Sequence, residues 1–246
     1  MPMIPAEVMS SSKRTARIAG LLYLTVVISG FFSIAYVPSQ LIVRGDAAST
    51  ISNLEASRQL YQMGIVAGVI CYTAFLVLPL VLYRLLSSVS RNAAALMVAF
   101  AVVSVPLALV NLRHQLDVLS LLNRSGLLHG LSIDQLHTQV LLSLEASRNG
   151  ALITEVFWGL WLLPFGYLVF RSGFLPRILG VFLMLGCFGY LINCLGRVLS
   201  PGYSASTFAS LISIPSAIGE IGTCLWLVVA GVRVPRSHAV TAADAI

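Results

Sequence analysis

Six long apolar runs constrain this chain more than any other feature. They occupy residues 17–37, 62–86, 92–117, 150–170, 178–199 and 208–232. A helix needs about 20 apolar residues to cross a hydrocarbon core of ~30 Å, and each run is at least that long. Only 10% of all residues are charged, against roughly a quarter in soluble domains. We therefore predict an all-α polytopic membrane protein, a single transmembrane domain over residues 1–246 with a bundle of six transmembrane helices.

The connecting segments predict two further helices, both extracellular and amphipathic. Gly45-Asp46 begins the first, over residues 47–61, with Asp46 as its N-cap. Ser132-Ile-Asp-Gln135 fits a capping box and begins the second, in which Ile133, Leu136, Val140 and Leu144 recur at helical spacing. By contrast, the short connector 87–91 predicts that the second and third spans are antiparallel neighbours.

A short repeat suggests an internal organisation. Leu54-Glu-Ala-Ser-Arg58 recurs as Leu144-Glu-Ala-Ser-Arg148, each just before a span. One interpretation is three hairpins, each formed by two successive spans. The alternative is chance similarity between small helix-forming residues.

The positive charges indicate topology and exclude nucleic acid as a partner. The net charge is +6, but the basic residues form no patch with interleaved aromatic residues. On one side of the bundle we place Lys13, Arg14, Arg17, Arg84, Arg91, Arg171, Arg177, Arg233 and Arg236, and on the other Arg44, Arg58, Arg113, Arg124, Arg148 and Arg197. This bias predicts that both termini are cytoplasmic. The basic cluster before the first run also resembles a signal peptide, but that run is longer than a typical signal core.

No motif for catalysis, metal binding or a cofactor stands out. Four cysteines, Cys71, Cys187, Cys194 and Cys224, lie in apolar spans without CxxC spacing, which favours free, packed thiols. His114, His129, His137 and His238 lack the spacing of metal ligands, and neither GxSxG nor a glycine-rich phosphate loop occurs. We predict no cofactor, no metal and no catalytic residue, so an intramembrane enzyme ranks third among the candidate functions.

Charged and polar residues inside the spans are the candidates for function. At about 1.5 Å per residue, Glu155, Asn193 and Glu220 lie ~20–24 Å from the cytoplasmic arginine of their helices. Arg197 lies near ~30 Å, at the outer boundary. An unpaired charge at that depth costs on the order of 3 kcal/mol. We therefore predict that Arg197 neutralises Glu220.

The remaining polar residues extend this prediction. Arg113 or His114 is the expected partner of Glu155. Polar residues recur at helical spacing on two spans, namely Tyr190, Asn193 and Arg197, and Ser213, Ser216, Glu220 and Thr223. Trp158 and Trp161 fit an interfacial aromatic belt.

Two functional interpretations follow. The first is an outward-facing polar cavity, built by the last three spans, that binds or transports a small molecule or a lipid. Its candidate ligand-binding residues are Glu220, Arg197, Asn193, Glu155, His114 and Arg113. The second is a structural or regulatory membrane subunit whose polar residues only fix helix packing. Beyond the lipid bilayer, the partners considered are that ligand and a second copy of the chain.

Several stretches resemble a known family, an uncharacterised group of bacterial multi-pass membrane proteins called domain of unknown function 4386. The matching stretches are Arg17-Ile-Ala-Gly-Leu-Leu-Tyr23, Leu41-Ile-Val-Arg-Gly-Asp46, Gly159-Leu-Trp-Leu-Leu-Pro-Phe-Gly-Tyr167, Ser172-Gly-Phe-Leu-Pro-Arg-Ile-Leu-Gly180, Gly219-Glu220 and Leu225-Trp226-Leu227. The resemblance implies a protein of the bacterial inner membrane and supplies no substrate or reaction. It places Glu220 in a family motif. Arg44 stands where the family tends to have proline, which affects the first extracellular turn.

Overall fold

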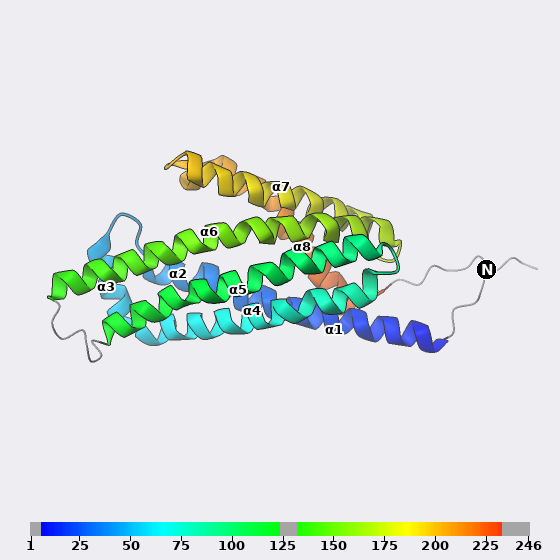
Figure 1. Cartoon of the computed structure of the whole chain (residues 1–246), viewed down its shortest axis with the longest axis horizontal. Coiled ribbons are helices and arrows are strands. Elements are labelled where there is room, and N and C mark those ends of the chain that lie inside the picture. Colours follow the sequence, from blue (N-terminus) through cyan, green and yellow to red (C-terminus); the bar gives the residue numbers. More distant parts are fainter. Residues whose placement is uncertain (1–5, 124–131, 233–246) are drawn as a thin grey trace, which may run out of the picture.

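The computed structural model describes residues 6–123 and 132–232, and in these residues it is helical without a strand (Figure 1). The helices are α1 (Ala6–Gly30), α2 (Val37–Leu41), α3 (Ala47–Ala56), α4 (Arg58–Leu86), α5 (Arg91–Leu122), α6 (Ile133–Ser172), α7 (Arg177–Leu199) and α8 (Thr207–Val229). Six helical stretches are long and apolar enough to cross a membrane. The predicted all-α class is confirmed, and the six predicted spans correspond to six candidate membrane-spanning helices.

The first span continues past the predicted boundary at residue 37. A π-helical segment, Phe31–Tyr36, joins α1 to α2, so that one candidate span covers Lys13–Leu41. The N–H of Val37 donates to the carbonyl of Phe32 across the wider turn. Pro38 lacks an N–H and clashes with the carbonyl four residues earlier in a regular α-helix. The wide turn relieves both problems, which explains why the helix does not end before the proline.

The second amphipathic segment is not a separate helix. The capping box at Ser132 is present as predicted, but α6 then runs unbroken to Ser172 through Asn149-Gly150. Neighbouring α5 supports this passage, because Asn111 Nδ2 donates to the carbonyl of Ser147 at 2.9 Å. The Asn111 side chain also fills the space where Gly150 would otherwise carry a Cβ. Tertiary contact thus holds the helix together where the local sequence favours a break.

The six spans form a closed ring of neighbours. Packing contacts join α1 to α4, α4 to α5, α5 to α6, α6 to α7, α7 to α8, and α8 back to α1. The predicted pairing of the second and third spans is therefore confirmed. Contacts join both the two helices of each hairpin that the repeat suggests and the neighbouring hairpins, so all three pack into one bundle. Figure 1 shows α5 and α6 extending beyond the α7–α8 hairpin at the end where α3 lies.

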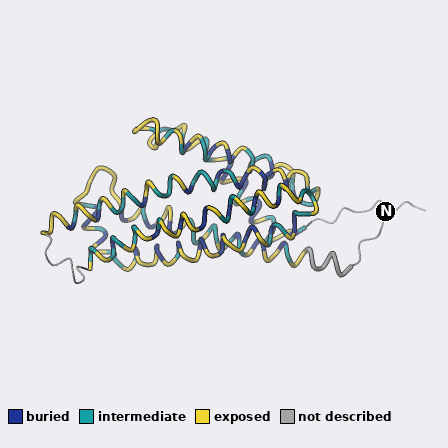
Figure 2. The backbone as a smooth tube through the Cα atoms, in the orientation of Figure 1, coloured by how far each residue is buried: buried dark blue, intermediate teal, exposed yellow. Residues whose placement is uncertain are grey.

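Aromatic residues fill the centre of the ring. Trp161 is only 1% exposed and stacks on Phe165, with ring centroids 5.0 Å apart, while Phe75 and Tyr23 form T-shaped pairs with it. Trp158 stacks on Tyr72 of α4. The interfacial belt predicted for these tryptophans is thus wrong for Trp161, because its face of α6 points inward. Figure 2 shows how buried and exposed residues interchange along each helix.

A second apolar cluster closes the end of the bundle near α3. Ile51 and Leu54 of α3 are buried against Leu41 of α2, Val118 of α5 and Val140 of α6. The N-cap of α3 is Asp46 as predicted, since its Oδ1 accepts from the Ser49 N–H at 2.9 Å. This cluster includes no residue of α7 or α8, so the two parts of the bundle are packed separately.

All four cysteines are free thiols, as predicted. Three of them donate to carbonyls of neighbouring helices, from Cys71 to Val26, from Cys194 to Leu152 and from Cys224 to Gly20, at 3.6–3.8 Å. These contacts give the thiols a packing role. The charged residues predicted at 124, 233 and 236, and the histidines at 129 and 238, lie outside the described residues.

Candidate functional site

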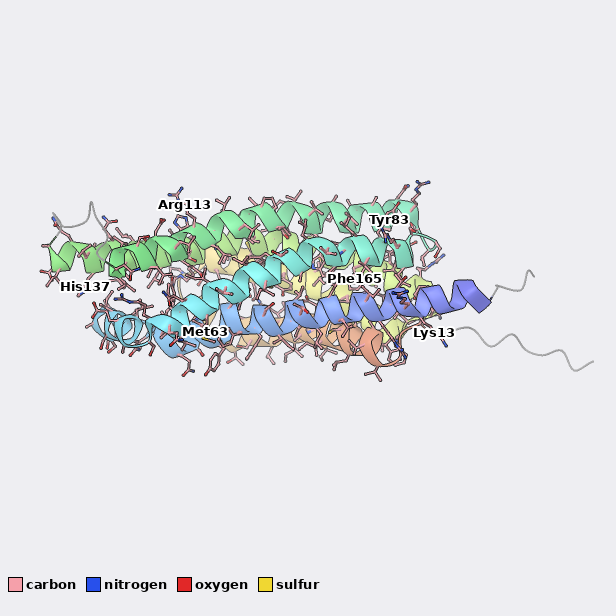
Figure 3. The ribbon with its side chains drawn as sticks, turned by 90° about the horizontal axis from the view of Figure 1, so that it is seen from below. Lys13, Met63, Tyr83, Arg113, His137 and Phe165 are labelled. Atoms are coloured by element: carbon pink, nitrogen blue, oxygen red, sulfur yellow. The ribbon has the colours of Figure 1, made fainter. Side chains whose placement is uncertain are left out.

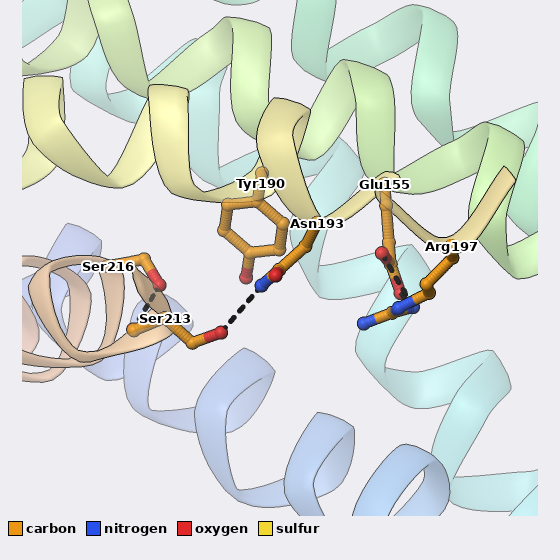
Figure 4. Close-up of a pocket in the computed structure, with 6 residues that line it drawn as sticks. All are labelled: Glu155, Tyr190, Asn193, Arg197, Ser213 and Ser216. Carbon is orange, nitrogen blue, oxygen red and sulfur yellow. Dashed lines mark hydrogen bonds and ion pairs between the residues drawn. The ribbon is translucent and has the colours of Figure 1, made fainter. Parts of the chain in front are cut away.

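A polar cavity lies between α6, α7 and α8. Its volume is about 130 Å³, and its lining residues are Glu155 of α6, Tyr190, Asn193 and Arg197 of α7, and Ser213 and Ser216 of α8 (Figure 4). The spacings i, i+3 and i+7 on α7 and i, i+3 on α8 place these side chains on one face of each helix. The predicted polar faces of the last two spans are therefore brought together, with α7 in the middle.

Glu155 and Arg197 form an ion pair in the wall of the cavity. Arg197 Nη1 donates to both carboxylate oxygens, at 2.8 Å to Oε1 and 3.0 Å to Oε2. The Glu155 side chain is 16% exposed and that of Arg197 is 37% exposed. The prediction that Arg197 neutralises Glu220 is wrong, because α6 presents Glu155 beside Arg197.

Glu220 instead accepts hydrogen bonds from two tyrosines. Tyr190 of α7 donates to Oε1 at 3.2 Å, and Tyr23 of α1 donates to Oε2 at 3.4 Å. Among the described residues no arginine, lysine or histidine forms an ion pair with this half-buried carboxyl group. Glu220 therefore joins α1, α7 and α8 through neutral donors. Tyr23 was absent from the predicted site, and its only sequence signal was its place in a family motif.

Arg113 and His114 do not reach the cavity. Both lie 3.7 Å from the carboxylate of Asp117 on their own helix, and 74% of the Arg113 side chain is exposed. Figure 3 shows Arg113 at the outside of the bundle. The predicted contact with Glu155 is wrong, since their helical neighbour at i+3 and i+4 is an acid and their face of α5 points away from α7.

Asn193 hydrogen-bonds α7 to α8 and to the turn between them. Its Nδ2 donates to Ser213 Oγ at 2.7 Å and to the Ala209 carbonyl at 3.3 Å, and its Oδ1 accepts from the Tyr203 hydroxyl at 2.8 Å. The residue as a whole is 5% exposed. Asn193 therefore shapes the wall of the cavity, with its polar groups already satisfied.

The cavity has a donor side and an acceptor side. Within the described part of the chain, Nη2 and Nε of Arg197 have no hydrogen-bond partner. Ser216 Oγ donates to the Ser213 carbonyl and Tyr190 Oη donates to Glu220, so each keeps lone pairs available to accept. No group of three potential metal-ligating side chains lies together in residues 6–123 and 132–232.

Six helices that are long and apolar enough to cross a membrane, with a polar cavity among the last three, fit a multi-pass membrane protein. The chain belongs to the family described as Domain of unknown function (DUF4386), which matches residues 18–231. It is also similar to an uncharacterized protein of Archaeoglobus fulgidus, 33% identical over 76 residues, which are 31% of this chain and 43% of that protein. This relative is therefore matched over less than half of its length. No solved structure is similar to the chain.

Proposed function

We propose that this protein binds a small polar molecule or a lipid head group in the cavity between α6, α7 and α8. The observation that carries the proposal is the Arg197–Glu155 ion pair beside a polar cavity of about 130 Å³, in helices apolar enough to cross a membrane. An ion pair with an exposed partner contributes only about 0–1 kcal/mol to stability, and the Arg197 side chain is 37% exposed. A pair that only fixed packing would bring little advantage here, whereas a pair that leaves two guanidinium nitrogens available suits a ligand.

The alternative function is a structural or regulatory subunit, and specific contacts favour it. Asn193, Ser213 and Tyr203 satisfy one another, and Glu220 connects three helices through two tyrosines. A purely structural network, however, explains neither the volume left at its centre nor the open donors of Arg197. Ligand binding therefore accounts for more of the site.

The proposed location is the cytoplasmic membrane of a bacterium, with the Lys13 end of the bundle in the cytoplasm. Among the residues whose side chains the structure describes, the cations at this end are Lys13, Arg14, Arg17, Arg84, Arg91, Arg171 and Arg177. No Asp or Glu of the described side chains is adjacent to them in the sequence. Figure 3 shows Lys13 and Tyr83 at one end and His137 at the other. The positive-inside rule then places α3 and the start of α6 outside. The cavity accordingly belongs to the outer half of the membrane.

Native mass spectrometry of the gently solubilised protein tests the proposal. We expect wild type to retain a bound small molecule or lipid, and Arg197→Gln and the double variant Arg197→Gln/Glu155→Gln to lose it. The double variant avoids leaving an unpaired carboxylate. The matched control is Arg148→Gln/Glu145→Gln, which removes an exposed ion pair of α6 outside the cavity and should keep the ligand.

The structural alternative predicts a different result. In that case wild type carries no specific ligand, and the cavity variants lower the melting temperature by several degrees while the control does not. Such a pattern would refute the binding proposal.

A further inference from the structure

The two sides of the cavity have opposite character, and we infer that its ligand is a small zwitterion carrying a primary ammonium group and an oxyanion. This inference rests on the proposed binding function and names the chemical class of the ligand. It follows from three features of the described residues, which are the Arg197 donors without a hydrogen-bond partner there, the acceptors near Tyr190, and the lack of a cation paired with Glu220.

Arg197 provides the oxyanion subsite. Its guanidinium uses one nitrogen for Glu155 and leaves Nη2 and Nε, which are arranged to donate to a carboxylate or phosphate. Glu155 fixes the position of the guanidinium through both of its oxygens. The ion pair therefore orients the Arg197 guanidinium and leaves two of its nitrogens able to donate to a ligand.

Tyr190 and Ser216 provide the ammonium subsite. Tyr190 lines the cavity while its hydroxyl proton is directed to Glu220, so the oxygen can accept from the cavity side. Ser216 Oγ likewise directs its proton to the Ser213 carbonyl. An ammonium group has three donors and no acceptor, and these two oxygens complement it.

Glu220 gives this subsite its charge preference. The Glu220 carboxyl group accepts a hydrogen bond from the Tyr190 hydroxyl, so Tyr190 lies between it and the cavity. It has no cationic partner among the described residues. A charge inside a membrane span is stable only when it is paired or hydrated. A ligand ammonium placed against Tyr190 would supply the missing counter-charge, and Arg197 would balance the ligand's acid group.

The dimensions suit a compact ligand. Tyr190 and Arg197 are seven residues apart on α7, about 10 Å along the helix axis, and both side chains lead into a volume of about 130 Å³. A β-amino acid or ethanolamine phosphate is long enough to bridge this distance, because the Tyr190 and Arg197 side chains each cover part of it. Ethanolamine phosphate is also a phospholipid head group, so the same chemistry has a soluble and a lipid source.

A thermal-shift titration of the full-length protein in detergent tests the class of ligand. The probes are ethanolamine phosphate and β-alanine, compared at equal ionic strength with the isolated halves, namely inorganic phosphate, acetate and ethylamine. We expect at least one zwitterion to raise the melting temperature and the halves to leave it unchanged. Equal stabilisation by phosphate or acetate alone would overturn the inference and leave a simple anion site, so the proposed function would survive.

Variants assign the two ends. Tyr190→Phe keeps the ring and removes the accepting oxygen, and Arg197→Gln removes the donors. Each should weaken zwitterion binding by about tenfold or more, the typical effect of one charge-assisted hydrogen bond. Glu220→Gln should do the same, and Tyr190→Phe covers the case in which Glu220→Gln does not fold. Affinity unchanged in Tyr190→Phe would contradict the ammonium subsite, and Arg148→Gln serves as the control.

Nanodiscs and native mass spectrometry distinguish the two sources of ligand. Preferential retention of phosphatidylethanolamine over phosphatidylglycerol, without a shift by soluble zwitterions, identifies a lipid head group. A shift by soluble zwitterions that is independent of lipid identifies a free metabolite. If neither lipid nor any soluble probe binds, the inference fails, whereas the proposed function fails only if wild type also retains no ligand in native mass spectrometry.

Discussion

At the scale of single residues, glycines decide how closely α7 approaches its neighbours. A Cβ on Gly180 would lie 2.6 Å from the Gly166 carbonyl oxygen and from the Phe170 backbone nitrogen of α6. On the other side of α7, a Cβ on Gly189 would meet the Ile212 carbonyl of α8. These contacts hold the cavity-lining face of α7 in place between two helices.

Gly180→Ala should destabilise the protein. Alanine is the better helix former by about 1 kcal/mol, but its methyl group would overlap backbone atoms that cannot move independently. We expect a net loss of about 1–3 kcal/mol in the free energy of unfolding, as in other overpacked interiors, measured as a lower melting temperature in detergent. Gly202→Ala is the control, because no atom lies within 4 Å of its Cβ position and its φ is −88°. A Gly180→Ala protein as stable as this control would disprove the close contact.

At the scale of elements, α3 is a short helix that depends on its cap and on its burial. Asp46 accepts from the Ser49 N–H at 2.9 Å and from the Ser49 hydroxyl at 2.6 Å. These hydrogen bonds from Ser49 lower the pKa of Asp46, because they stabilise the ionised form. The contribution of the cap is therefore fully present above the pKa of Asp46 in the unfolded chain, and it is lost as the pH falls through the lowered pKa in the folded protein.

Asp46→Asn should loosen α3 in a manner that depends on pH. Hydrogen exchange of the α3 amides, compared between wild type and variant at the same pH, should show faster exchange in the variant at neutral pH. The difference should disappear in acid, when Asp46 of the wild type is protonated. Glu55→Gln in the same helix removes an exposed acid that caps nothing and should leave the exchange unchanged at every pH. A pH-independent difference for Asp46→Asn would contradict an ionic cap.

At the scale of the whole molecule, ring closure and charge asymmetry act together. Packing of α8 on α1 closes the ring, where a Cβ on Gly20 would lie 2.6 Å from the Val228 backbone nitrogen. The missing side chain of Gly20 therefore permits this close approach. Closure brings Tyr23 of α1 to Glu220, so the site includes the first span as well as the last three.

The proposed orientation predicts which turns an impermeant thiol reagent can reach. In a variant without the native cysteines, Ser204→Cys in the α7–α8 turn should react in intact cells. Ser88→Cys in the α4–α5 turn should react only after permeabilisation. Both positions are exposed, so burial does not explain a difference between them. The reverse pattern would invert the topology and place the cavity in the cytoplasmic half.

The sequence alone determined the features that depend on neighbouring residues along the chain. Hydropathy defined the six spans, the capping residues marked the starts of α3 and α6, and helical spacing placed Tyr190, Asn193 and Arg197 on one face. The caps and the shared face follow from local helix geometry, and the spans follow from the preference of apolar segments for the lipid bilayer. None of the three requires knowledge of another helix.

Only the tertiary structure decided which groups meet. The rotation and axial offset of α6 bring Glu155 to Arg197, those of α1 and α7 bring Tyr23 and Tyr190 to Glu220, and the contact with α5 carries α6 through Asn149-Gly150. Several cations and acids lie at similar depth in different spans, so depth cannot select the pairs. Pairing depends on how the helices pack around the ring, which is a property of all six spans together.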